Sequence, residues 1–226
     1  FDTVIQGIHT ALEDGHKKLG ISSRIIMCFL RHLDESAAFE TLEQALPYKK
    51  WIIGVGLDSS EMGHPPSKFE RVFSKAIANG FISVAHAGEE GPAEYVWEAI
   101  NLLKVSRIDH GNRSIDDKQL IKHIAEKQIP LTVCPLSNLE LKVVDDLKDH
   151  PLLQLMDSGL MVTLNSDDPA YFGGYMNENY IEIASALNLS KKQITELAKN
   201  SFISSFLLDD EKEQMIQKVE TFYQNN

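Results

Sequence analysis

Six short apolar segments, separated by stretches with helical periodicity, constrain the fold of this chain more than any other feature. The apolar segments span residues 24–30, 51–57, 81–86, 107–110, 130–134 and 160–165. Apolar residues at helical spacing predict helices over 3–19, 36–46, 66–79, 93–104 and 116–127, a short helix near 151–158 and a helical tail to about residue 224. Because the apolar segments do not alternate with polar residues, they predict parallel strands covered on both faces by helices.

Two architectures join parallel strands by helices: an open doubly wound sheet and a (β/α) barrel. No GxGxxG or GxxxxGK[ST] motif follows the first strand, which removes the commonest reason to choose a nucleotide-binding open sheet. Residues able to do chemistry instead gather at the C-terminal ends of strands, the rim at which barrel enzymes build their sites. They are Asp58, His86, Asp109, His110 and Asp167. The sequence therefore predicts an α/β fold, a TIM-barrel-type parallel barrel domain over residues 1–226 with about six of eight strands.

The net charge narrows the class of binding partner, and the cysteines indicate the redox environment. The net charge of −11 argues against nucleic acid or an anionic membrane surface as the main partner. No apolar run approaches the length of a transmembrane helix. Cys28 and Cys134 lie far apart in strand-like segments, so they predict two buried, reduced thiols and a cytoplasmic setting.

The segment HAGEEG combines a strand-end histidine, His86, with a carboxylate three residues later, Glu89. The imidazole is placed to bind a metal, and the carboxylic acid can carry a proton without binding the metal itself. Taken alone, the motif is explained more simply by a hydrogen-bonded histidine beside a solvated glutamate at a helix start.

Two further strand ends carry polar clusters. RIDHG contributes Asp109 and His110; the imidazole could orient or deprotonate a water, and the acid could fix its tautomer. NSDDP contributes the adjacent carboxylates Asp167 and Asp168, which repel each other unless a cation or a shared proton offsets the charge. An Asx turn would also explain that pair. Three such clusters in one sheet favour a metal-dependent site over three unrelated turns.

The motifs HAGEEG, RIDHG, PLTVCPLSN and VTLNSDDPAYFGGY, in this order and at these intervals, resemble the adenosine/adenine deaminase family of the amidohydrolase superfamily. GVGLDSSEMGHPP and the ending DPAYFGGY look like the adenine deaminase branch in particular. The resemblance covers nearly the whole chain. It implies a complete barrel in the family, one Zn²⁺ per chain, and hydrolytic loss of ammonia from C6 of a small-molecule purine base.

The resemblance also implies a role for each matching residue. Glu89 would donate a proton to ring N1, and His110 would orient the attacking water and help remove its proton. Asp168 would bind the purine near N7 and contact the attacking group. The zinc ligands would be His86 and Asp167. The contacts to the purine edge would be Glu61 and Ser59.

The chain departs from the family pattern at its start. The family's first strand carries an HxH pair that supplies two more zinc ligands, and none of the eight histidines here forms such a pair. The first predicted helix matches the helix after the family's second strand, so the sequence predicts an N-terminally truncated barrel. His32 and His64 both follow strands and are the candidates to replace a missing ligand.

Three functions stay open on the sequence alone. The leading one is zinc-dependent deamination of adenine to hypoxanthine and ammonia, a reaction of purine salvage. The second is a deaminase of adenosine or of N6-substituted adenines. The third is an inactive truncated relative that acts as a binding or interaction module, for which Tyr171, Phe172 and Tyr175 would offer a stacking surface. Exposed edges of an incomplete barrel would favour homo-oligomers.

Overall fold

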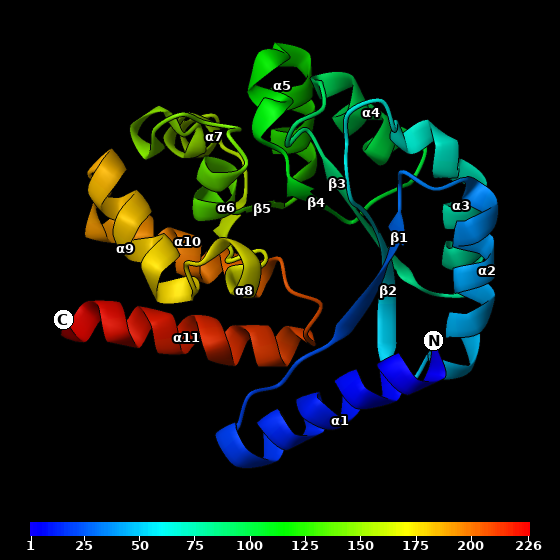
Figure 1. The fold of residues 1–226 in the computed structure, drawn as a ribbon. Coiled ribbons are helices and arrows are strands. Elements are labelled where there is room, and N and C mark those ends of the chain that lie inside the picture. Colours follow the sequence, from blue (N-terminus) through cyan, green and yellow to red (C-terminus); the bar gives the residue numbers. More distant parts are fainter. The chain divides into compact units, whose positions relative to one another are not determined.

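A computed structural model describes residues 1–226 (Figure 1). The chain divides into two compact units. Unit 1 comprises Phe1–His86 and Trp97–Ser106, and unit 2 comprises Ala87–Val96 and Arg107–Asn226. The strand β3 (Ile82–Ala87) and the helix α4 (Ala93–Asn101) each contribute residues to both units.

Unit 1 contains parallel strands in sequence order. β1 (Ile25–Leu30) pairs with β2 (Ile52–Asp58), with Leu30 opposite Asp58, and β2 pairs with β3. The other elements are α1 (Asp2–Leu19), α2 (Glu35–Ala45), η1 (Leu46–Tyr48), η2 (Pro66–Phe69) and α3 (Glu70–Ala78). In Figure 1 the helices α2 and α3 lie side by side along these strands. Their apolar faces are buried there, among them Leu42 and Phe73.

The helix predicted over 66–79 is divided into η2 and α3. Pro65 and Pro66 restrict the backbone at its start, so the chain makes a tight 3₁₀ turn before the α-helix begins. Gly80, with φ of 81°, supplies the left-handed residue after the helix. The helix predicted over 3–19 is confirmed as α1, but Val4, Ile8 and Leu19 on it are exposed.

Unit 2 holds the other three strands, also parallel and in sequence order. β4 (Arg107–His110) pairs with β5 (Leu131–Val133), and β5 pairs with β6 (Val162–Leu164). The first helices are η3 (Asn112–Asp116), α5 (Lys118–Lys127), α6 (Pro135–Glu140), η4 (Leu147–Asp149) and α7 (Leu152–Asp157). The last are α8 (Pro169–Phe172), α9 (Met176–Leu187), α10 (Lys191–Ile203) and α11 (Asp209–Asn225).

The six predicted strands are all present, and helices alternate with them. This arrangement confirms the α/β class predicted from the sequence, with parallel strands and intervening helices as in (β/α) barrels. The short helix α6 was not predicted; it begins at Pro135, directly after Cys134 at its N-cap. None of the helices combines the length and the apolar character needed to cross a membrane.

Candidate active site

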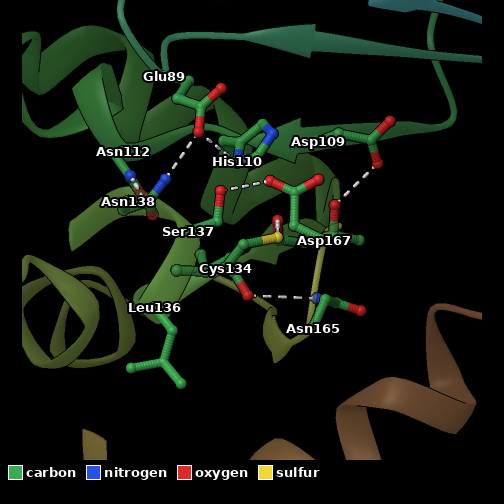
Figure 2. Close-up of polar contacts among 12 residues, drawn as sticks. Glu89, Asp109, His110, Asn112, Cys134, Leu136, Ser137, Asn138, Asn165 and Asp167 are labelled. Atoms are coloured by element: carbon green, nitrogen blue, oxygen red, sulfur yellow. Dashed lines mark hydrogen bonds and ion pairs between the residues drawn. The ribbon is translucent and has the colours of Figure 1, made fainter. Parts of the chain in front are cut away.

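The carboxyl ends of β4, β5 and β6 place polar side chains at one edge of unit 2. The register fixes this arrangement, because Asp109 lies opposite Thr132 and Val133 lies opposite Leu164. Side chains that follow the last paired residues therefore lie close together. Figure 2 shows the resulting cluster, which includes Glu89, His110, Ser137, Asn138 and Asp167.

Glu89 is the buried carboxyl group of the cluster, with 8% of its surface exposed. Its Oε1 accepts a hydrogen bond from Nδ2 of Asn138 at 2.8 Å and lies 3.2 Å from Nδ1 of His110. Gly88 precedes it with φ of 71°, where a Cβ would meet Val96 Cγ2 at 2.6 Å. Glycine therefore permits the turn that brings Glu89 inward. The simpler interpretation of HAGEEG, a solvated glutamate, is wrong for this residue.

His110 and Asp167 both have left-handed backbone conformations, with φ of 66° and 55°. Such conformations are uncommon for residues other than glycine and are found at functional sites, where the surrounding structure holds them. The metal-binding atoms of the two side chains lie within 4.8 Å of each other. Imidazole nitrogen and carboxylate oxygen are donors that zinc accepts, so this pair could hold a metal.

The two adjacent carboxylates of the NSDDP motif have different surroundings. Asp167 is half-buried, and its Oδ2 accepts a hydrogen bond from the hydroxyl of Ser137 at 2.7 Å. Asp168 is exposed at the N-cap of α8. Since only one of the two is partly removed from water, the like charges need not both be compensated in the interior.

Asp109 contacts residues other than His110, the partner that the sequence suggested for it. Its Oδ1 accepts a hydrogen bond from the Thr132 hydroxyl at 2.7 Å and lies 3.5 Å from Nε of Arg107. The carboxylate at 3.2 Å from His110 Nδ1 is that of Glu89. Successive side chains of a strand point to opposite faces, so adjacent residues such as Asp109 and His110 can contact different carboxylates and hydroxyls.

Asn138 and Ser137 are site residues that the sequence did not assign. Both are buried on α6 and contact the two predicted functional carboxylates, Glu89 and Asp167. The Oδ1 of Asn138 also accepts a hydrogen bond from Nδ2 of Asn112 at 2.8 Å. The available signal was PLSN directly after a strand, because a proline there starts a helix at the strand's carboxyl end.

The remaining predicted site residues lie in unit 1. His86 is half-buried near the end of β3, and its carbonyl accepts a hydrogen bond from Nη1 of the buried Arg31 at 2.8 Å. Glu61 is buried, with 2% of its surface exposed. Ser59 is exposed and has φ of 78°, and its hydroxyl lies 2.8 Å from Nδ1 of the exposed His32.

The prediction of two buried thiols is confirmed for Cys134 and wrong for Cys28, which is half-buried. Neither cysteine forms a disulfide bond. Burial raises the pKa of the Cys134 thiol well above its ordinary value, and the nearby carboxylates of Asp167 and Glu89 raise it further. Cys134 therefore remains a neutral thiol beside the site instead of a thiolate nucleophile.

Known proteins share this sequence and fold. The family model described as adenosine deaminase matches residues 1–222. The adenine deaminase of Hahella chejuensis is 57% identical over 223 residues, which are 99% of this chain and 67% of that protein. This chain spans about two thirds of the length of the curated relatives it matches.

Two solved structures extend the comparison. The crystal structure of an adenine deaminase from Arthrobacter aurescens has a TM-score of 0.96 and 44% identity, covering 99% of this chain and 68% of that one. An amidohydrolase from Burkholderia ambifaria, solved with bound Zn, has a TM-score of 0.90 and 26% identity, covering 96% of this chain and 61% of that one. The chain therefore belongs to the adenosine deaminase family, as its motifs had predicted.

Proposed function

We propose that the chain carries a zinc-dependent hydrolytic deaminase site for adenine, within one metal-dependent deaminase domain over residues 1–226. The observation that carries the proposal is the buried carboxyl group of Glu89, held by Asn138 and 3.2 Å from His110. The adenine deaminase names of relatives at 54–60% identity support adenine over adenosine and N6-substituted adenines as substrate.

The proposed reaction replaces the amino group of adenine by oxygen. Water forms a bond to C6 and loses both of its protons in the course of the reaction. Ring N1 takes up one proton and the amino nitrogen takes up another, and the C6–N6 bond then breaks to release ammonia and leave hypoxanthine. Glu89 is the proposed acid that protonates N1. Oε1 of Glu89 accepts a hydrogen bond from the side-chain amide of Asn138. When the carboxyl group is protonated, its proton is therefore expected on the other oxygen, Oε2.

His110 and Asp168 are the proposed residues on the side of the attacking water. The imidazole of His110 would accept a proton from that water and orient it. The exposed Asp168 is free to meet the purine near N7. Glu61 and Ser59 are proposed contacts to the purine edge, which for Ser59 requires that its hydroxyl share or leave the contact with His32.

Zinc is the proposed metal, with one ion per chain and His86 and Asp167 among its ligands. The donor chemistry fits this ion, and a related amidohydrolase was solved with bound Zn. When bound, such an ion lowers the pKa of a coordinated water towards about 7. The hydroxyl of Ser137 would hold the Asp167 carboxylate in orientation.

Ammonia release by the purified, zinc-supplied chain tests the proposal. Adenine, adenosine and N6-methyladenine should be compared, with the zinc content measured on the same sample. We expect adenine to be the preferred substrate and Glu89→Gln to abolish turnover while zinc is retained. Glu90→Gln is the matched control, since Glu90 is an exposed carboxylate one residue away. Turnover by Glu89→Gln would contradict the acid assignment, and no release from any substrate would favour a binding module.

A further inference from the structure

His150 is a buried histidine to which the proposed mechanism gives no role. It lies between η4 and α7, and 3% of its surface is exposed. The backbone N–H of Leu152 donates a hydrogen bond to its Nδ1 at 3.1 Å. A nitrogen that accepts a hydrogen bond carries no proton, so the ring hydrogen of the neutral imidazole is on Nε2. Burial lowers the pKa of His150 to about 4, which keeps the ring neutral near pH 7.

The protonated nitrogen of this ring faces Asn138. Nε2 of His150 lies 3.3 Å from Oδ1 of Asn138, so Nε2–H donates to that oxygen. The amide nitrogen of Asn138 then points to Glu89 and donates to Oε1 at 2.8 Å. The hydrogen bonds form one directed chain that starts at the backbone of Leu152 and ends at the proposed acid.

The backbone N–H of Leu152 sets the direction of this series of hydrogen bonds. An asparagine amide can turn over and exchange its oxygen and nitrogen, and Asn112 could turn together with Asn138 because its own Oδ1 makes no hydrogen bond. The backbone N–H of Leu152 cannot be reversed in this way. It fixes the tautomer of His150, and a turned Asn138 would present an N–H to the N–H of His150.

We propose that His150 is a positioning residue that holds the Asn138 amide in the orientation in which it donates to Oε1 of Glu89, leaving Oε2 to carry the transferable proton. The inference rests on the proposed function of Glu89. Without the donor on His150, the Asn138 amide can turn and offer its oxygen to Glu89, so that the proton is drawn to Oε1 and away from the substrate.

Kinetics of three variants test the positioning role. His150→Phe keeps a planar ring but removes the N–H that donates to Asn138, whereas His150→Gln keeps an N–H donor. Asn112→Ala leaves His150 intact and removes the other side chain that donates to Asn138 Oδ1, whose own amide can turn over. We expect His150→Phe to lower kcat by about tenfold with KM within about twofold, since orientation of a reacting group affects the chemical step. His150→Gln should recover most of that loss, and Asn112→Ala should lose less than His150→Phe. Equal kcat in the wild type and His150→Phe would overturn the proposal.

Nuclear magnetic resonance of the unmodified protein tests the hydrogen-bonded chain without any assay of turnover. With ¹⁵N-labelled histidine, His150 should show a protonated Nε2 and an unprotonated Nδ1 from pH 8 to pH 5. A protonated Nδ1 or a charged ring in this range would overturn the proposal even in an active enzyme. If the protein releases no ammonia but His150 shows the expected tautomer, the hydrogen bonds from Leu152 to Glu89 are supported. In that case the proposed deaminase function is wrong, and the proposed arrangement of the hydrogen bonds is not.

Discussion

The hydroxyl of Ser137 donates a hydrogen bond to Oδ2 of Asp167 over 2.7 Å. The two residues are 30 positions apart in the sequence, on α6 and just after β6. Asp167 has an uncommon left-handed backbone conformation, with φ of 55°, and such conformations persist where contacts from the surrounding structure support them. Ser137 provides that support and leaves the second carboxylate oxygen available for a metal.

Removing this hydroxyl should weaken metal binding. Partners that hold a metal ligand typically contribute about 10- to 100-fold to affinity, so we expect Ser137→Ala to raise the Kd for Zn²⁺ by about tenfold. Ser114→Ala is the matched control, because Ser114 is fully buried and its hydroxyl makes no hydrogen bond. Competition with a chromogenic chelator measures both values. Equal affinities in the two variants would show that the Ser137 hydroxyl does not support the ligand.

His150 should make the stability of the chain depend on pH between about 4 and 6.5. Its pKa is lowered from 6.5 to about 4 by burial, so between these values the unfolded chain binds a proton that the folded chain does not. The free energy of unfolding should therefore fall as pH decreases from 6.5 to 4, by up to about 3 kcal/mol in total.

Urea unfolding at several pH values, compared between the wild type and His150→Gln, isolates this contribution. The difference between the two proteins should change over that pH range and become constant below it. His16→Gln, at an exposed position on α1, controls for the loss of a histidine. A difference that is independent of pH would show that His150 titrates alike in the folded and unfolded chain.

The two thiols should react at different rates in the folded protein. The pKa of Cys134 is raised by burial and by nearby carboxylates, whereas Cys28 is half-buried. With a disulfide reagent at pH 8, we expect at most one thiol to react within minutes in the native chain and both to react in urea. Cys28→Ser should remove the native reaction, and rapid labelling of that variant would contradict the assignment.

Arg31 should be important for the stability of unit 1. Its guanidinium is fully buried and donates to the carbonyl of His64 at 2.9 Å and to that of His86 at 2.8 Å. Hydrogen bonds from charged groups contribute about 1.5–3 kcal/mol each, so Arg31→Met should lower the free energy of unfolding by about 3 kcal/mol.

Arg31→Lys should have nearly as low a free energy of unfolding as Arg31→Met, because a single ammonium group cannot reproduce the two diverging N–H donors of the guanidinium. Arg71→Met is the control, since 79% of the Arg71 side chain is exposed and its pairing with Glu35 should contribute less than about 1 kcal/mol. Urea unfolding measures all three variants. A loss at Arg31 no larger than at Arg71 would contradict the supporting role.

The strands and the positions of the candidate site residues at their ends could be predicted because both follow from local sequence. Apolar runs without alternation define the buried strands, and His110 and Asp167 stand where such runs end. The split of the helix predicted over 66–79 was also readable, in principle, from the adjacent prolines. The exposed Val4 and Ile8 show the limit of periodicity, which predicts a helix but not what its apolar face contacts.

The polar network around Glu89 could not be predicted, because it depends on distances between residues far apart in the sequence. Asn138 and Glu89 are separated by 49 positions, and His150 reaches the site only through Asn138. A buried histidine followed by proline has no signature of function by itself. Sequence adjacency also did not identify the carboxylate that lies 3.2 Å from His110 Nδ1, which is that of Glu89.

The direct passage from β5 into α6 limits how this site can change in evolution. Only Cys134 separates the strand from the first residue of the helix, Pro135. Neighbouring residues on a helix point about 100° apart, so Ser137 and Asn138 serve different carboxylates only in the present register. An inserted residue would misdirect both side chains at once. Enzymes of this architecture usually diversify by lengthening the loops after their strands. At the junction of β5 and α6 such a lengthening would disrupt the contacts to both carboxylates, so we expect it to be tolerated better at other strand ends.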